Sequence, residues 1–483
     1  MSKRLPGNRF SILLQLPCLA ALLFSGCGQT AKPVIPPTVG QVDSYFGSPF
    51  NVVASSVPKS VTKFDHAMNQ ITVSSFVNTA TAQVPSAIIN GTFAAAPTGF
   101  LGITENFATG ASGVISAQNP PLTGAWAVEI PGVGVLANLL TLNGGGATLT
   151  HAAPAAMAEN IACPAAQAGE FLYVTVPNQT TNNEPADYGA VSIASQGSAV
   201  TFMASPFLVG GFAVTPSTVT GGCSNTIFGP VTSFPLNSFG LPSNLELIAI
   251  SQSGLLLSSF TEGSAGTSPG AFGGGTGVIG VPLATAPVDV SAVVAAKYNG
   301  FSYAPQTTAN ASYDISTLAS AFGDNNATSP ACGALQSSLV ANNGQGAGTV
   351  QGLPSANSLY GGEFLSGSGS TTVNDPTAAN GSENCDIVLD LGTQDSSSAG
   401  LFPNAKIFVG SNFPPFSETK PWTCFGTTLT CAVSFPASAV VGELGGKFVI
   451  FVVSSSVSTP PAQLPDNLGS FITQPMGIYL FQK

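Results

Sequence analysis

The sequence predicts an all-β protein made of antiparallel barrel-like or sandwich domains, with a few short helices. From residue 43 onward, short runs of Val, Ile, Phe, Thr and Leu alternate with clusters of Gly, Asn, Pro and Ser, which is the pattern of strands and turns. A hydrophobic share of 44% and a mean hydropathy of +0.35 exclude a charged, disordered chain. A β-propeller is the alternative, although no regular repeat of about 40 to 50 residues is evident.

In the first half of the chain, apolar runs bounded by turn residues predict strands. The run 171–176 (FLYVTV) is almost continuously apolar, so we expect that strand to be buried on both faces. Residues 152–159 (AAPAAMAE) predict a short helix, which Pro154 limits. The strand candidates are 70–77, 86–93, 99–107, 124–130, 135–142, 171–176, 189–194 and 200–204.

The second half of the chain shows the same pattern of short apolar runs separated by turn residues. Strands at 245–251 and 254–260 are separated by Gln252-Ser253, which predicts a hairpin. The alternating segment 477–482 needs a partner strand, and 298–303 is the expected one. Further strands are predicted at 288–297, 300–304, 385–391, 405–410, 431–435 and 447–454, and short helices at 315–322 and 332–340.

Length predicts about two or three folded domains. We place two, at 43–240 and 241–483. The Gly/Ser-rich loop 263–277 is an expected hinge. Residues 171–207 (FLYVTVPN…FMASPF) resemble a blade of lactonase-type propellers. That resemblance covers one short stretch, and it implies the propeller alternative.

The first residues have the order of an export signal. Lys3, Arg4 and Arg9 precede the mostly apolar run 12–24, and small residues follow before Cys27. This order predicts a signal peptide over 1–26, too short to span a membrane as a helix. An ordinary secretion signal and a retained membrane anchor are the alternatives to the lipoprotein signal described next.

The tetrapeptide Phe24-Ser25-Gly26-Cys27 resembles the lipobox of bacterial lipoproteins, although Phe24 stands where that family usually has Leu. The resemblance implies that Cys27 is lipidated and becomes the mature N-terminus. Gly28, rather than Asp, follows the cysteine, which implies an outer-membrane or cell-surface destination in the envelope. Residues 27–42 are then the lipidated cysteine and a flexible, Pro-rich tether.

Charge excludes one class of partner. Only 7% of residues are charged, and the formal net charge is −11. Both arginines, Arg4 and Arg9, lie in the predicted signal, so the mature chain has no guanidinium group to clamp a phosphate. Nucleic-acid binding is therefore not expected. Because so few ion pairs can form, we also expect protonation of carboxylates to remove little stability.

Six cysteines remain after the signal and the lipidated Cys27, and an even number in an exported protein predicts disulfides. Metal-binding cysteines would need close C-x-x-C spacing, which this sequence lacks. Pairing between neighbours in sequence is the expected connectivity, although six cysteines allow about 15 arrangements. The expected pairs are Cys163–Cys223, Cys332–Cys385 and Cys424–Cys431.

Several catalytic patterns are present but lack their context. The G-x-S-x-G match at 266–270 has Pro269 after its serine, so the backbone donor of an oxyanion hole is missing. The G-x-G-x-x-G match at 275–280 runs into Val281-Pro282, which breaks a helix. The chain has two histidines, His66 and His151, so a three-histidine zinc site is impossible. A mixed histidine–carboxylate site is possible, but no spacing supports it.

An acidic run at 375–395 is the strongest candidate site. If 385–391 is a strand, Asp386 and Asp390 share one face. Two such carboxylates could hold calcium or form an acid–base pair for sugar cleavage, whereas a solvated strand face is the plain interpretation. The loop Asp324-Asn325-Asn326 is a weaker site of the same kind. For Trp126 and Trp422 we expect buried packing rather than stacking on a sugar.

Together these observations predict a lipid-anchored exported protein with a structural or binding role at the cell envelope. Its partners would be the membrane, through the lipid, and a glycan or a protein. No enzymatic activity is expected, and no cofactor apart from calcium at the acidic run. The alternative is a secreted hydrolase, either like a propeller lactonase or a carboxylate-dependent glycosidase.

Overall fold

A computed structural model shows the fold of the chain. It describes residues 41–49, 59–76, 85, 87–110, 113–115, 125–142, 149–159, 168–177, 186–213, 216–226, 229–235, 244–250, 254–261, 275–303, 317–344, 350–365, 376–377, 382–410, 432–455 and 475–483.

The first sheet is a closed up-and-down barrel, called barrel 1 below. Consecutive strands pair antiparallel, β9 pairs with β1, and the pairing of β4 with β5 leaves only β6 as an appended strand. Its strands are β1 (Val42–Pro49), β2 (Lys59–Asp65), β3 (Gln70–Phe76), β4 (Ala87–Ala95), β5 (Leu101–Gly110), β6 (Gly113–Ile115), β7 (Trp126–Ile130), β8 (Gly134–Leu142) and β9 (Leu149–Glu159).

Barrel 2 has the same plan. It closes through β10 with β18 and through β11 with β12, and β13 is the appended strand. Its strands are β10 (Gly169–Pro177), β11 (Asp187–Gln196), β12 (Ala199–Leu208), β13 (Phe212–Ala213), β14 (Ser217–Thr226), β15 (Gly229–Pro235), β16 (Asn244–Ile250), β17 (Leu256–Thr261) and β18 (Gly275–Pro282).

Barrel 3 closes through β19 with β27 and through β20 with β21, and it carries β22 as its appended strand. Its strands are β19 (Tyr298–Tyr303), β20 (Thr317–Asn325), β21 (Ser358–Leu365), β22 (Ser382–Glu383), β23 (Ile387–Asp390), β24 (Leu401–Gly410), β25 (Ala432–Leu444), β26 (Lys447–Ser454) and β27 (Gly477–Gln482).

The predicted fold class is confirmed: the described chain is all-β and antiparallel, with barrels. The propeller alternative is wrong, because each sheet closes on itself instead of forming an open blade. The segment that resembled a propeller blade is the β10–β11–β12 meander of barrel 2. Three barrels form where two β domains were expected, and the expected boundary at residue 240 falls between β15 and β16, which pair with each other.

Most predicted strands match the observed ones closely. The expected pairing of the last strand is confirmed, since Tyr298 aligns with Gln482 and Tyr303 with Gly477. The antiparallel pairing expected of the strands on either side of Gln252-Ser253 is confirmed for β16 and β17, whereas that dipeptide itself lies outside the described residues. The prediction of burial on both faces also holds for β10, in which every residue from Phe171 to Pro177 is buried.

Three local predictions are wrong. Residues 152–159 lie in strand β9 and not in a helix, because β1 and β8 pair with its two edges. Residues 315–322 fall largely in strand β20. The strand expected at 288–297 contains α2 (Val290–Ala295), which begins where the Asp289 carboxylate accepts hydrogen bonds from the backbone N–H groups of Ser291 and Ala292.

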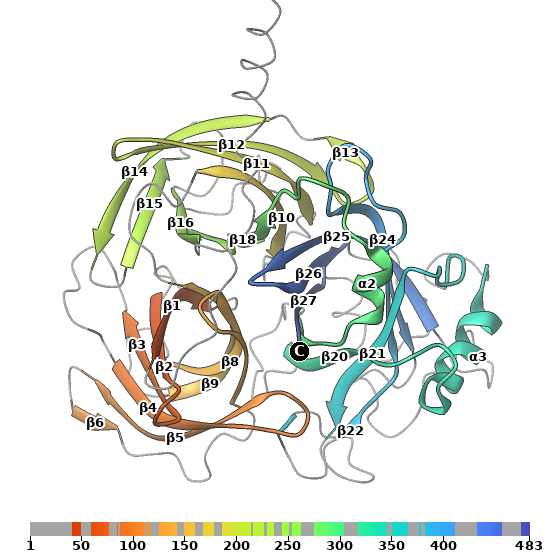
Figure 1. Cartoon of the computed structure of the whole chain (residues 1–483), viewed down its shortest axis with the longest axis horizontal. Coiled ribbons are helices and arrows are strands. Elements are labelled where there is room, and N and C mark those ends of the chain that lie inside the picture. The colour runs from red at the N-terminus through yellow and green to blue at the C-terminus, as the bar shows by residue number, and fades with distance from the viewer. Residues whose placement is uncertain are drawn as a thin grey trace, which may run out of the picture.

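The helix predicted at 332–340 is confirmed as α3 (Gly333–Asn342), which follows a short 3-10 turn at Pro330–Cys332. It packs on the outside of barrel 3, where Leu335 and Leu339 contact a buried cluster that includes Phe408 (Figure 1). Among the described helices, none has the length and apolar character needed to cross a bilayer.

Each barrel has its own apolar interior. Because side chains alternate along a strand, every second residue points into the lumen. Tyr45, Phe64 and Met157 belong to the interior cluster of barrel 1, and Phe171 and Phe202 to that of barrel 2. Barrel 3 is filled in the same way by a separate cluster.

The outward-facing residues of the same strands form one further core, shared by all three barrels, which lie around a common centre (Figure 1). The shared core contains Trp126 from barrel 1, Val174 from barrel 2 and Phe451 from barrel 3. Strand contacts join β10 to β26, β9 to β16 and β7 to β19. Burial on both faces of these strands therefore holds the barrels together as a single body.

Candidate metal centre

Three polar side chains of barrel 1 point toward one another at one end of its lumen. Asp43 lies in β1, His66 directly follows β2, and Glu129 lies in β7. Each is two positions from a residue of the interior cluster, namely Tyr45, Phe64 and Ala127, so strand alternation directs all three inward.

The strand order explains how distant parts of the chain meet. Around the barrel, β2 and β7 are separated by β1, β9 and β8, which places them on opposite sides of the lumen. His66 and Glu129 therefore meet across the barrel, and Asp43 approaches from the strand beside β2. We call Asp43, His66 and Glu129 the barrel 1 triad.

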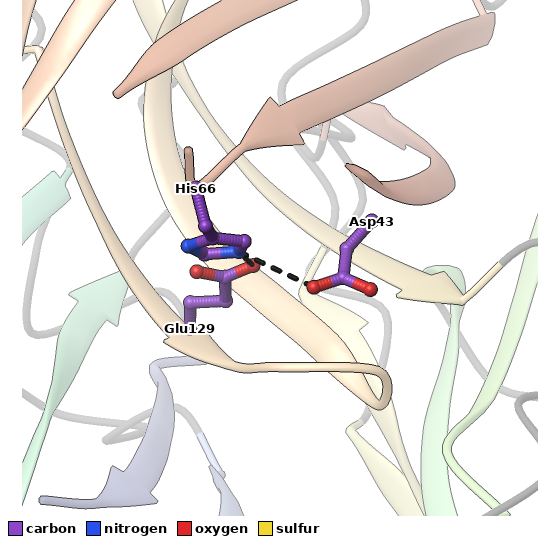
Figure 2. Close-up of side chains that lie close together, drawn as sticks. All are labelled: Asp43, His66 and Glu129. Atoms are coloured by element: carbon purple, nitrogen blue, oxygen red, sulfur yellow. Dashed lines mark hydrogen bonds and ion pairs between the residues drawn. The ribbon is translucent and has the colours of Figure 1, made fainter. Parts of the chain in front are cut away.

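The three ligand-type atoms of the triad are close together. His66 Nε2 lies 3.2 Å from Asp43 Oδ2 and 3.2 Å from Glu129 Oε1. All three atoms lie within 4.8 Å of one another. Figure 2 shows both carboxylates directed at the same edge of the imidazole ring. One Nε2 atom thus faces two carboxylate oxygens, although a single N–H cannot donate fully to both.

Neighbouring groups hold both carboxylates. The Tyr45 hydroxyl donates to Glu129 Oε1 at 2.7 Å and accepts from the backbone N–H of Gly132 at 3.1 Å. The Gln41 amide donates to Asp43 Oδ1 at 3.0 Å. The bond from Gln41 occupies Asp43 Oδ1, so Oδ2 is the oxygen that faces the imidazole ring.

Aromatic rings orient the imidazole. The His66 ring stacks on Phe64 with centroids 6.4 Å apart and meets the edge of Phe93 at 5.6 Å. The turn that follows is held by Asp65 Oδ1, which accepts from the N–H groups of Ala67 and Met68. Asp65 thus caps this turn and is not a member of the group around the His66 ring.

Burial governs the electrostatics of the triad. Asp43 is 6% exposed, and its Oδ2 accepts no hydrogen bond from any described residue. Burial raises the pKa of Glu129, and the bonds from Tyr45 and His66 only partly offset that rise. Burial and the nearby Glu129 charge raise the pKa of Tyr45 well above 10, so its hydroxyl stays a donor. The triad can hold a proton on His66 or a cation between the three side chains.

The two carboxylates predicted as a calcium site have different surroundings. Asp390 Oδ1 accepts from the Ser355 hydroxyl at 2.5 Å and from Gly392 N–H at 2.9 Å, while Oδ2 accepts from Ser355 N–H at 2.9 Å. Asp390 thereby holds the loop that precedes β21. Asp386 instead lies beside the buried Glu363. Each carboxylate thus has its own partners in the described structure.

Asp386 and Glu363 form a buried carboxyl pair. Asn384 donates to Asp386 Oδ2 at 3.0 Å. Burial raises the pKa of Asp386 to about 7, and burial together with the Asp386 charge raises that of Glu363 well above its usual value. Raised carboxyl pKa values are typical of glycosidase acids, but both side chains are at most 2% exposed, so a sugar could not reach them in this structure.

The two oxygen-rich stretches singled out from the sequence meet at one end of barrel 3. Asn325 donates to Glu383 Oε1 at 3.3 Å. Burial and the neighbouring Asp324 charge raise the pKa of Glu383 to about 8. For Asp324 itself, burial is outweighed by bonds from Lys483 and Lys297, which lower its pKa.

Raising the pH from about 5 to about 8 is expected to lower the melting temperature. Glu363, Glu383 and Asp386 have raised pKa values in the fold, so in this window the folded state binds more protons than the unfolded one. The stability that their protonated forms contribute is fully present below about pH 4, and it is lost as the pH rises through their pKa values in the folded state. The pKa of Asp324 is lowered, so its contribution to stability is instead lost as the pH falls toward that lower pKa.

Thermal melting across this range checks the prediction. Asp386→Asn should flatten the dependence, whereas the exposed Glu170→Gln should leave it unchanged. A melting temperature that rises steadily with pH, or an unaltered slope in Asp386→Asn, would contradict the assignment.

The disulfide predicted between Cys332 and Cys385 is confirmed, with a Cα–Cα distance of 5.1 Å. Cys223 is also disulfide-bonded. Its expected partner Cys163, the pair Cys424 and Cys431, and the lipidation site Cys27 lie outside the described residues.

The remaining sequence candidates have structural roles or lie outside the described chain. Trp126 is buried as expected, at 1% exposure, and Trp422 is outside the described residues, as is the serine motif at 266–270. The glycine motif at 275–280 forms part of β18. A Cβ at Gly280 would lie 2.3 Å from the Leu172 carbonyl oxygen, so this glycine permits close strand approach.

Sequence reasoning missed Asp43 and Glu129. His66 and Glu129 are 63 positions apart, and Tyr45 and Glu129 are 84 apart, so no local spacing connects them. One signal was available in the sequence: Asp43 lies two positions before Tyr45 in the same strand, so both side chains point to the same, inward face.

No protein-family model matches the chain, and no curated protein matches it. Solved structures with some likeness include a double mutant of the vaccine antigen Transferrin Binding Protein B from Haemophilus parasuis, at 8% identity over 93% of this chain and 76% of that chain, with a TM-score of 0.19. Another is intact Ap-TbpB with its N and C lobes, at 9% identity over 92% and 77%, with a TM-score of 0.18.

Proposed function

We propose that this protein is an exported, lipid-anchored binding protein of the cell envelope. The observation that supports a binding role is the apolar core shared by the three barrels. This core joins the barrels into one large rigid scaffold, which can present a surface to a partner. The barrel interiors are filled by buried side chains, which leaves barrel ends and connecting loops to meet a partner. The leader 1–27 supports the anchor.

The partner is proposed to be neutral and polar, either a glycan or a protein. The low charge of the chain, with 7% charged residues, leaves hydroxyl and amide groups as its main surface chemistry. Binding can be tested with the mature protein on an array of neutral and charged glycans. Binding confined to anionic glycans would contradict the proposal, because the chain is acidic.

Metabolic labelling tests the anchor. In a bacterial host the full chain should incorporate radioactive palmitate, and Cys27→Ser should abolish the label while Cys18→Ser, within the signal, retains it. An unlabelled wild-type chain, or label that survives in Cys27→Ser, would overturn the anchoring proposal.

A further inference from the structure

We propose that the barrel 1 triad, Asp43, His66 and Glu129, binds one divalent transition-metal ion of the zinc class. This inference deepens the proposed binding role by giving barrel 1 a defined ligand. It does not depend on the lipid anchor, so palmitate labelling and metal binding can fail separately.

The spacing of the donor atoms fits such an ion. Zinc bonds to imidazole nitrogen and carboxylate oxygen are about 2.0 to 2.2 Å, which places neighbouring donors of a tetrahedral ion about 3.3 to 3.6 Å apart. In the triad, Nε2 of His66 is 3.2 Å from both Asp43 Oδ2 and Glu129 Oε1. A shift of a few tenths of an ångström would bring all three donors to bonding distance from one point.

Asp43 supplies an independent observation. Its side chain is more than nine-tenths buried, and Oδ2 accepts no hydrogen bond from the described residues although it faces the ring. Its described polar neighbour is His66 Nε2 at 3.2 Å, whose single N–H cannot serve both carboxylates. A bound cation would therefore recover the free energy that burial of this oxygen costs. Gln41 meanwhile occupies Oδ1, so the unsatisfied oxygen is the one directed into the triad (Figure 2).

The surroundings of the triad resemble an organised outer shell of a metal site. Tyr45 and Gln41 each donate to one of the two carboxylates. Phe64 and Phe93 restrict rotation of the imidazole. Outer groups of this kind orient metal ligands and raise affinity.

The donor set selects the ion. One imidazole with two carboxylates suits zinc and its neighbours, whereas calcium and magnesium favour oxygen ligands throughout. Two ionised carboxylates would neutralise the charge of a divalent ion in this buried place. Three protein ligands also leave a fourth position for water. The competing state is a protonated His66 held between the carboxylates without any metal.

Calorimetric titration of the chelator-treated, full-length mature protein with zinc chloride tests the proposal. One zinc ion should bind per chain. His66→Gln and Glu129→Gln should each weaken binding by about 100-fold or more, and Tyr45→Phe, which removes only an outer hydroxyl, by about 10-fold.

Matched variants separate this site from others. His151→Gln removes the other histidine of the chain and Glu170→Gln an exposed carboxylate, and both should leave zinc affinity unchanged. Cobalt provides a second readout, because a low-symmetry site gives visible absorption that His66→Gln should abolish. Calcium should not displace the cobalt.

Three outcomes would overturn the proposal: no zinc binding by the wild type, unaltered binding in His66→Gln, or loss of binding in His151→Gln. Circular dichroism establishes whether each variant is folded. If His66→Gln fails to fold, Tyr45→Phe decides, because it retains every ligand and a ring of the same shape. Unaltered affinity in folded Tyr45→Phe, together with unaltered cobalt absorption, would count against the site.

Discussion

Replacing Trp126 with alanine is expected to lower the free energy of unfolding by about 3 to 5 kcal/mol. Trp126 is 1% exposed and lies where barrel 1 meets barrel 3. Its ring packs edge-on against Phe100 at 5.2 Å and tilted against Phe301 of barrel 3 at 6.0 Å. Phe100 also contacts Phe364 of barrel 3 at 5.3 Å. Removing the indole would therefore leave a cavity within the shared core.

Urea unfolding measures this effect. Phe207→Ala is the matched control, because Phe207 is also a strand aromatic but is 37% exposed, and its loss should cost about 1 kcal/mol or less. If Trp126→Ala cost no more than Phe207→Ala, the shared core would not stabilise the protein as described.

Removing the Cys332–Cys385 disulfide is expected to cost about 4 kcal/mol. The bond closes a loop with a sequence separation of 53, and chain entropy of the unfolded state makes long loops the most sensitive to such a loss. The bond also joins the start of α3 to the approach to β23, and Cys332 and Cys385 are both buried in the cluster that seats this helix. Cys332→Ala/Cys385→Ala should therefore loosen α3 first.

Unfolding of the double variant under oxidising conditions gives the free energy, and hydrogen exchange shows where protection is lost. Amides of α3 should exchange faster, whereas amides of β10 in barrel 2 should change little. A cost below about 1 kcal/mol, or uniform loss of protection, would contradict this account of the bond.

Sequence patterns predicted much of the local structure but not the number of barrels. The strand pattern of 477–482 was sufficient to predict its partner, because a strand needs a neighbour for its backbone hydrogen bonds, and β19 is that neighbour. Nothing repeated in sequence marked three equivalent barrels, since barrel closure constrains backbone pairing and allows side chains to vary. The boundary at residue 240 failed for that reason.

Local propensity was misleading where tertiary pairing decided the outcome. The alanine-rich residues 152–159 favour a helix in isolation, but in β9 small side chains let strands approach closely. A Cβ at Gly47 of β1 would lie 2.4 Å from the Ala156 carbonyl oxygen. Conversely, the cap at Asp289 was enough to start α2 inside a Val-rich segment that resembled a strand.

The candidate site depended on information that a single sequence does not carry. A mixed histidine–carboxylate site was considered possible, but its acidic members come from β1 and β7, which only barrel closure brings to His66. By contrast, Asp386 and Asp390 stood out because they are near in sequence. In the fold, Asp386 accepts a hydrogen bond from Asn384, whereas Asp390 accepts one from Ser355.

Anomalous diffraction at the zinc absorption edge, from crystals of the mature protein grown with zinc, tests the central claim most directly. We expect one strong peak inside the end of barrel 1, about 2.0 to 2.2 Å from His66 Nε2, Asp43 Oδ2 and Glu129 Oε1. Crystals with no peak there, in which His66 instead donates a hydrogen bond to one of the two carboxylates, would contradict the claim.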